Sequence, residues 1–130
     1  MIVPDASVIL ELLLRTPAAH VIETRLFDED ETLHAPALLD VEVAQVLRRY
    51  ESRGEISAER GRLALDLLAQ FPIQRYPHEP LLQRIWTLRR NLTAYDAAYI
   101  ALAEALDATF LTRDARVGKS AGHRAEVEVV

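Results

Sequence analysis

Four acidic residues lie within apolar segments of the sequence or directly after them. Asp5 closes the opening stretch "MIVPD", Glu42 borders the apolar stripe of a helical segment, Asp96 lies within "TAYDAAYIALAEAL", and Asp114 follows "ATFLT". Carboxylates that converge repel one another unless a divalent cation joins them, and an all-oxygen ligand set favours Mg²⁺ or Mn²⁺ over zinc. Together these residues predict metal-assisted phosphoryl transfer or hydrolysis.

Asp96 also has a purely local interpretation. Thr93 can cap the helix that begins here, and Asp96 would then be its third helical residue, at the spacing of a capping box. A carboxylate at this position is also favoured by the positive end of the helix dipole. This stretch alone therefore leaves both roles open.

Glu42 approaches the core without a neutralising neighbour on its own helix. The residues three and four positions ahead of it are Gln45 and Val46, so no cation stands at the usual helical spacing. It flanks a stripe with helical periodicity formed by Leu39, Val43, Val46 and Tyr50. An acid in this position is expected to coordinate a metal or to find a cation elsewhere in the fold.

The elements that must position these acids alternate between strand and helix. Strands are predicted at residues 1–5, 32–36, 71–77, 108–112 and 126–130, and helices at 7–15, 17–30, 37–54, 58–70, 79–91, 93–106 and from Asp114. Pro17, Gly54 and Ser57 fit a first helical residue, a helix end and an N-cap. Alternation of this kind predicts a parallel sheet with helices on both faces and ligands at the carboxyl ends of its strands, which places Asp5 and Asp114 at one rim.

Composition limits the classes of protein that the chain can be. Its 130 residues suit one domain, residues 1–130, and the 50% hydrophobic and 27% charged content is typical of a folded protein. The absence of cysteine excludes disulfides, thiolate metal sites and cysteine nucleophiles, and fits a cytoplasmic protein. A net charge of -5 argues against binding nucleic acid by bulk electrostatics, so a polyanion would need a local site.

The apolar N-terminal stretch "SVILELLL" is not expected to be a signal peptide or a membrane span. Glu11 interrupts it, no basic leader precedes it, and it is shorter than the roughly 20 residues that a bilayer requires. We expect mature sequence here and no membrane association.

The segments "MIVPDASVILELL", "PALLDVEVAQVLRR", "LTAYDAAYIALAEAL" and "ATFLTRDARV" occur in the order and spacing found in PIN-domain ribonucleases. Over essentially its full length the chain resembles the small VapC-type toxins of bacterial toxin–antitoxin pairs. The resemblance implies a three-layer α/β/α fold with a mainly parallel central sheet. Carried over residue by residue, it implies that Asp5, Glu42, Asp96 and Asp114 bind Mg²⁺ or Mn²⁺ and are catalytic.

The resemblance also implies a function and partners. It predicts a metal-dependent endoribonuclease that cuts RNA, inhibits translation and growth, forms a homodimer and is neutralised by a cognate VapB-type antitoxin. Ser7 and Thr112 match hydroxyl positions that support the acids in this family, although an N-cap and an ordinary strand-end threonine explain them equally well. Pro4 departs from the aliphatic residue that usually precedes the first acid. Asp40 lies about 200° around the helix from Glu42 and is left out of the site.

Two other functions remain in view. A haloacid-dehalogenase-type phosphatase also uses an aspartate after its first strand but needs a second Asp two residues on, where this sequence has Ser7. A catalytically silent PIN module would have lost one or more of the four acids.

The remaining aromatic and basic residues receive simpler interpretations. We expect Trp86 and the tyrosines to be core residues rather than base-stacking residues. The four histidines show no metal-ligand spacing and no hydrolase triad. Arg89 and Arg90 are candidates for contact with a phosphate backbone, with a solvated helix face as the alternative.

Overall fold

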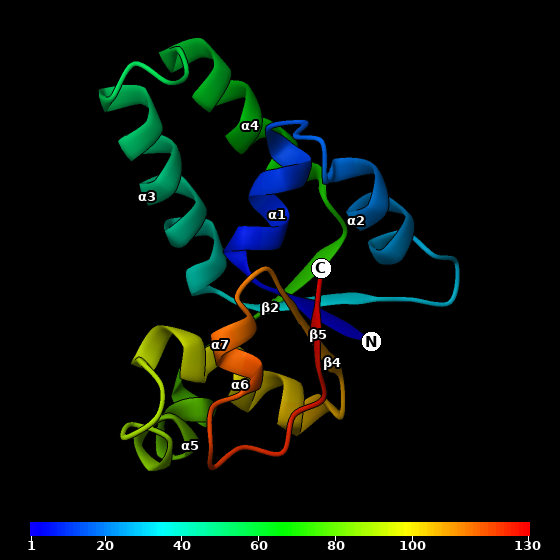
Figure 1. Ribbon diagram of the computed structural model, residues 1–130, viewed down its shortest axis with the longest axis vertical. Coiled ribbons are helices and arrows are strands. Elements are labelled where there is room, and N and C mark those ends of the chain that lie inside the picture. Colours follow the sequence, from blue (N-terminus) through cyan, green and yellow to red (C-terminus); the bar gives the residue numbers. More distant parts are fainter.

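The computed structural model describes residues 1–130 and contains a five-stranded sheet in which every neighbouring pair of strands is parallel. The strand order is β3-β2-β1-β4-β5, so the first strand of the chain is the central one (Figure 1). The strands are β1 (Ile2–Pro4), β2 (Leu33–Pro36), β3 (Ile73–Tyr76), β4 (Thr109–Thr112) and β5 (Val127–Val129). All five predicted strands are therefore confirmed.

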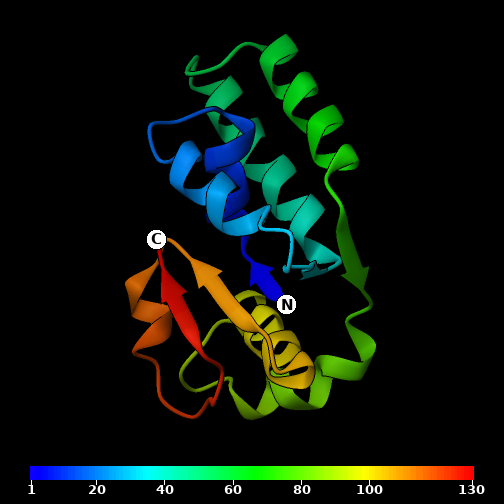
Figure 2. The same ribbon diagram turned by 90° about the vertical axis from the view of Figure 1, so that its right-hand side faces the viewer.

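Helices cover both faces of this sheet, as Figure 2 shows. One face carries α1 (Ala6–Leu13), α2 (Ala19–Leu26), α3 (Leu38–Ser52) and α4 (Ala58–Gln70). The other carries α5 (Leu82–Thr87) and α6 (Ala94–Leu106), and the short α7 (Ala115–Gly118) packs beside β5. The arrangement is the three-layer α/β/α fold that was predicted.

The central strand ends at the proline that departs from the family pattern. Pro4 is in register with Leu111 of β4, and the next residue restores the ladder because the Asp5 N–H donates to the Leu111 carbonyl at 3.1 Å. A proline is tolerated here because it occupies the end of the strand. The first acid therefore leaves the sheet in a fixed position.

The helix that carries Asp96 has a long buried stretch. Every residue from 97 to 103 is buried, and α6 packs against β1, β2 and β4. The many alanines of this segment allow a close approach to the sheet. This packing fixes the N-terminal turn of α6, and with it Asp96, against the carboxyl edge of the sheet.

Helix ends agree with the predicted signals in several places and differ in two. Ser57 caps α4 by accepting from the Arg60 N–H, and Gly54 follows α3 with a φ of 73°. Pro17 is not the first residue of α2, which begins at Ala19. The helix predicted over 79–91 divides into a 3₁₀ turn at Glu79–Leu81, where Pro80 offers no N–H, and α5, which ends at Thr87. No helix of the molecule has the length and apolar character needed to cross a bilayer.

Candidate active site

The four predicted acids come from elements that meet at the carboxyl edge of the sheet. Asp5 follows β1, Asp114 follows β4, Asp96 lies in the first turn of α6, and Glu42 lies near the start of α3. Their charges act on one another. The charges of Asp5 and Asp96 both contribute to raising the pKa of Glu42, and the charge of Asp114 contributes to raising that of Asp96. The structure therefore brings the four predicted acids into one electrostatic group.

Asp5 is held by two hydroxyls and a backbone amide. Ser7 Oγ and Thr112 Oγ1 each donate to its carboxylate at 2.5 Å, and the Val8 N–H donates at 3.2 Å. Burial raises the pKa of Asp5, and these hydrogen bonds partly oppose that effect. The alternative role of Ser7 as an N-cap is wrong, because the Asp5 side chain itself caps α1.

The same two hydroxyls tie Asp5 to the segment that carries Asp114. Ser7 Oγ accepts from the Arg113 N–H at 3.1 Å, and Thr112 Oγ1 accepts from the Asp114 N–H at 3.0 Å. Thr112 has no exposed surface. The hydroxyls therefore join the ends of β1 and β4 and set the position of one acid relative to the other.

Glu42 is oriented by a tyrosine from the opposite side of the sheet. The Tyr99 hydroxyl donates to Glu42 Oε1 at 2.7 Å, and Tyr99 is only 2% exposed. Burial is the main cause that raises the pKa of Glu42, followed in the same direction by the charges of Asp5 and Asp96. No cation forms an ion pair with Glu42, so its charge is not neutralised within the chain.

Asp96 lies in the first turn of a helix whose N-cap is Thr93. Thr93 Oγ1 accepts from the Asp96 N–H at 3.1 Å, which confirms Thr93 as the N-cap. Burial raises the pKa of the Asp96 carboxyl. Hydrogen bonding to the Thr93 side chain opposes this effect, the charge of Asp114 adds to it, and the charge of Arg116 opposes it. Asp96 is therefore a helix-turn residue that also carries an incompletely compensated charge.

Asp114 differs from the other three because it has a cation partner. Arg116 donates to its carboxylate from Nε at 3.1 Å and Nη2 at 3.0 Å, and the Arg116 N–H donates at 2.9 Å. These bonds lower the pKa of Asp114. The Arg116 side chain is 91% exposed and is a residue that the sequence analysis did not select. Its spacing of two residues from Asp114 was the available signal.

The chemistry of this group fits a hard divalent cation, although the present arrangement is not a ready coordination sphere. No three His, Cys, Asp or Glu side chains lie close enough together to hold a metal ion. The available donors are carboxylate and hydroxyl oxygens, which suit Mg²⁺ or Mn²⁺. Partial burial raises the pKa of the Asp5, Glu42 and Asp96 carboxyls, and a bound cation would relieve the cost of keeping them charged. Binding would require the carboxylates to turn toward a common point.

The prediction that the aromatic residues are buried is wrong at two positions. Trp86 is 68% exposed and Tyr95 is 64% exposed, whereas Tyr99 is buried as expected. The guanidinium of Arg89 lies 4.6 Å from the centre of the Trp86 ring, an exposed cation–π pair. Both rings lie on helix faces that the rest of the chain leaves largely uncovered.

Residues that were left out of the site have other partners. Asp40 pairs with Arg75 at 2.9 Å, as expected for an acid on another face of α3. His34 Nδ1 lies 2.7 Å from the Tyr76 hydroxyl, and His78 accepts from the Leu38 N–H at 2.9 Å. These two histidines therefore act in local structure, and no histidine forms a hydrogen bond with the four acids.

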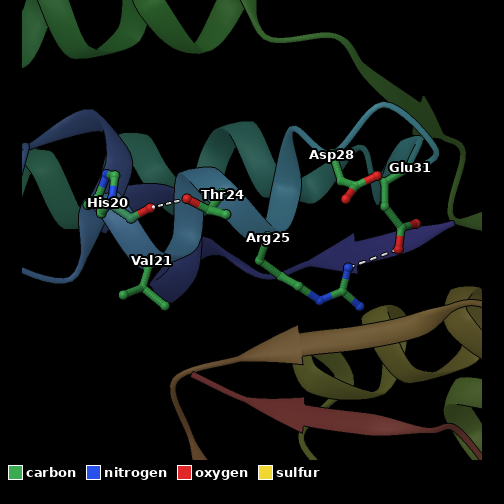
Figure 3. A pocket seen from close by; sticks show the side chains of 6 residues that line it. All are labelled: His20, Val21, Thr24, Arg25, Asp28 and Glu31. Carbon is green, nitrogen blue, oxygen red and sulfur yellow. Dashed lines mark hydrogen bonds and ion pairs between the residues drawn. The ribbon is translucent and has the colours of Figure 1, made fainter.

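A hollow of about 560 Å³ lies along α2, away from the four acids (Figure 3). It is lined by His20, Val21, Thr24, Arg25, Asp28 and Glu31. Arg25 is already paired with Glu31 at 2.8 Å and with Glu128 at 3.0 Å. Glu31 also binds the Met1 ammonium group, which precedes β1 and so lies at the opposite edge of the sheet from Asp5. We therefore assign the candidate site to the acids and not to this hollow.

Comparison with known proteins identifies the family of the chain. The family model for the PIN domain matches residues 2–122. The chain belongs to the PIN-domain family. Among curated PIN-domain relatives, the ribonuclease VapC12 of Mycobacterium tuberculosis is 43% identical over 130 residues, covering 100% of this chain and 99% of the relative. The ribonuclease VapC1 of the same species is 42% identical over 129 residues, covering 98% and 96%.

Solved structures support the PIN fold at much lower sequence identity. VapBC2 from Rickettsia felis, solved with a DNA fragment from its promoter, aligns with a TM-score of 0.75 at 13% identity and covers 99% of this chain and 98% of that one. VapC20 of Mycobacterium tuberculosis, described as a toxin that cleaves the sarcin–ricin loop, aligns with a TM-score of 0.69 at 16% identity, covering 95% and 97%. Both show a shared PIN-domain architecture.

Proposed function

We propose that this PIN-domain protein is a VapC-type toxin, an endoribonuclease that hydrolyses RNA phosphodiester bonds with Mg²⁺ or Mn²⁺. The observation that carries the metal requirement is the group of partly buried acids at the carboxyl edge of the sheet, of which Asp5, Glu42 and Asp96 have no ion-pair partner. The ribonuclease class is supported by relatives of that name that match the full chain.

The side chains that would hold the cation are Asp5, Glu42, Asp96 and Asp114. When bound, the cation supplies an activated water and neutralises charge that develops on the phosphate. Ser7 and Thr112 hold the Asp5 carboxylate in place, and the Tyr99 hydroxyl holds Glu42 through Oε1.

The biological setting follows from the same relationship. As a VapC-type toxin, the protein would arrest growth by destroying RNA needed for translation and would be held inactive by a VapB-type antitoxin, as the VapBC complexes among its structural neighbours suggest. The four acids offer an electrostatic target for a basic side chain of such a partner. The net charge of -5 of the whole chain acts in the same direction. We further propose a cytoplasmic homodimer.

The decisive experiment treats total bacterial RNA with the purified protein and maps the new ends. Cleavage should require Mg²⁺ or Mn²⁺, vanish with EDTA and be absent from Asp5→Asn. Thermal unfolding gives a second readout, because Mn²⁺ should raise the melting temperature of the wild type more than that of Asp5→Asn. Full cleavage in EDTA would contradict the metal mechanism.

The two rival functions can each be distinguished from a ribonuclease. Family membership and the position of Ser7, whose hydroxyl donates to Asp5, argue against a haloacid-dehalogenase-type phosphatase. A silent binding module would retain RNA without cutting it under any metal condition. That result would replace the nuclease proposal.

A further inference from the structure

An open groove of about 370 Å³ begins at the acid group and runs along α3. Its lining residues come from α1, α3 and the first turn of α6, and they are Ala6, Val41, Glu42, Gln45, Val46, Arg49 and Tyr95. We call this feature the α3 groove. It shares Glu42 with the candidate active site, and Tyr95 directly precedes Asp96. A molecule lying in the groove would therefore touch the acids at one end.

The walls of the α3 groove near the acids are apolar and exposed. The side chains of Tyr95 and Val41 are 64% and 72% exposed, respectively. A single exposed apolar residue is ordinary on a protein surface, but an aromatic and an aliphatic side chain that line one groove beside an acid cluster form a surface for a flat ligand. An unpaired nucleic-acid base has that shape and stacks on aromatic rings.

The far end of the α3 groove carries a free cation. Glu42, Gln45 and Arg49 follow the three-and-four spacing of one helix face, and seven residues of helix separate Glu42 from Arg49 by about 10 Å. Arg49 is exposed and takes part in none of the ion pairs that occupy other arginines, such as Arg75 and Arg84. An unpaired guanidinium in an acidic protein suits a phosphate.

We propose that the α3 groove binds the unpaired RNA base next to the scissile phosphate, with the base stacked on Tyr95 and a neighbouring phosphate held by Arg49. This inference rests on the proposed ribonuclease function and assigns its substrate a specificity subsite. Along the groove, the acid group is followed by the apolar wall and then by Arg49. In the same order, these features suit the scissile phosphate, a base and a neighbouring phosphate of a single strand. A second copy of the chain bound in the groove would not require a cation beyond the apolar wall.

The test uses a single-stranded oligoribonucleotide that contains the cut site mapped from total bacterial RNA. Tyr95→Ala should lower kcat/KM on this probe by about 10-fold or more, because a base stacked on an aromatic ring contributes strongly to binding. Tyr95→Phe, which keeps the ring, should retain the wild-type value. Arg49→Gln should lower kcat/KM by a few-fold and weaken its dependence on salt. Unfolding curves verify that each variant is folded.

Matched controls lie elsewhere on the surface of the molecule. Trp86→Ala removes an aromatic residue of similar exposure outside the groove, and Arg48→Gln removes the adjacent arginine, which faces away from it. Both should cleave like the wild type. Oligoribonucleotides with an abasic position on either side of the cut complete the test. The wild type should lose activity on one of them, and Tyr95→Ala should lose nothing further on that probe.

Each other result overturns the inference. Wild-type cleavage by Tyr95→Ala, or equal further losses on intact and abasic probes, would show that the ring does not bind a base. A fall in molecular mass of Tyr95→Ala by light scattering, with cleavage per folded chain unchanged, would reassign the α3 groove to contact between copies. If the wild type cuts no RNA at all, the proposed function itself fails, and that outcome is distinct from a failure of the groove alone.

Discussion

The two ends of α6 each carry an acid that is shielded from solvent, Glu104 almost completely and Asp96 in part, but only one of these acids has a counterion. The Glu104 side chain, near the C-terminal end, is 2% exposed and accepts from Arg84 at 2.8 and 2.9 Å, and hydrogen bonding to Arg84 lowers its pKa. At the N-terminal end, burial raises the pKa of Asp96, and no ion pair neutralises that residue. At the C-terminal end, the carboxylate of Glu104 is compensated by an ion pair and is a feature of the structure alone. At the N-terminal end, the carboxylate of Asp96 has no counterion, and this absence marks the candidate site.

The contrast explains why the acid group is expected to reduce stability in the absence of metal. Charges that lie near one another without cations oppose folding, whereas a paired charge supports it. Sites that keep such charges give up stability for function. Four predictions test this difference, and they are ordered from the largest expected effect to the smallest.

Asp96→Asn should reduce RNA cleavage by about 1,000-fold or more, because it removes a proposed metal ligand and transition-state stabilisation with it. The metal-free variant should unfold at the same or a higher temperature than the wild type, since one repelling charge is gone. Cleavage assays and thermal unfolding with and without Mn²⁺ measure both effects. A destabilised variant that cleaves at the wild-type rate would return Asp96 to a role in the helix turn alone.

Glu104→Gln should produce the reverse pattern. It breaks a charged hydrogen-bond pair and should lower the free energy of unfolding by about 2 kcal/mol, a figure reduced for the partial exposure of Arg84. Cleavage per folded molecule should remain at the wild-type level, because Glu104 lies at the other end of α6. Denaturant unfolding monitored beside activity distinguishes the two variants, and loss of cleavage in folded protein would end the comparison.

Thr112→Val should lower cleavage by about 10-fold. It removes a hydroxyl that donates to Asp5 and accepts from the Asp114 N–H, so both acids lose their fixed position. Thr112→Ser, which keeps the hydroxyl, is the control and should remain close to the wild type. Equal rates for the valine and serine variants would exclude a positioning role for this hydroxyl.

The pH dependence of stability should differ in sign between the two ends of α6. The raised pKa of Asp96 means that the folded state holds its proton to higher pH than the unfolded state, so this residue's contribution falls as pH rises through that range. Relative to the metal-free wild type, metal-free Asp96→Asn should therefore gain little free energy of unfolding near about pH 4 and more near about pH 7.

Glu104 supplies the matched case for that measurement. Its lowered pKa means that its contribution is present above the ordinary pKa of glutamate and disappears as pH falls through the folded value. The stability loss in Glu104→Gln should therefore shrink at low pH. Unfolding curves for both variants and the wild type across this range test the pair, and parallel pH profiles for the two variants would contradict the proposed difference.

Much of the fold could be predicted because its signals are local. Short apolar runs marked the strands, and Thr93, Ser57 and Gly54 marked helix ends through their own side chains or backbone conformations. The position of Asp5 and Asp114 at one rim followed from the rule that parallel strands end at the same edge. These inferences needed no knowledge of side-chain packing.

The errors and omissions concern contacts between distant parts of the chain. The hydrogen bond from Tyr99 to Glu42 joins two helices on opposite faces of the sheet, and the pair of Arg84 with Glu104 depends on how α5 packs on α6. The exposure of Trp86 and Tyr95 was mispredicted because residue type alone does not say which face of a helix finds a partner. Counterions and exposure are set by tertiary packing.

The strand order has a consequence for the order in which the site is completed during folding. β1 occupies the centre of the sheet, but the Thr112 hydroxyl that its neighbour β4 supplies to Asp5 lies 107 residues further along the chain. A contact between residues so far apart in the sequence closes a long loop and forms slowly compared with the contacts inside a single helix. The helices that carry Glu42 and Asp96 can therefore form before β1 and β4 pair, and the hydroxyl contact that orients Asp5 is among the last features of the site to form.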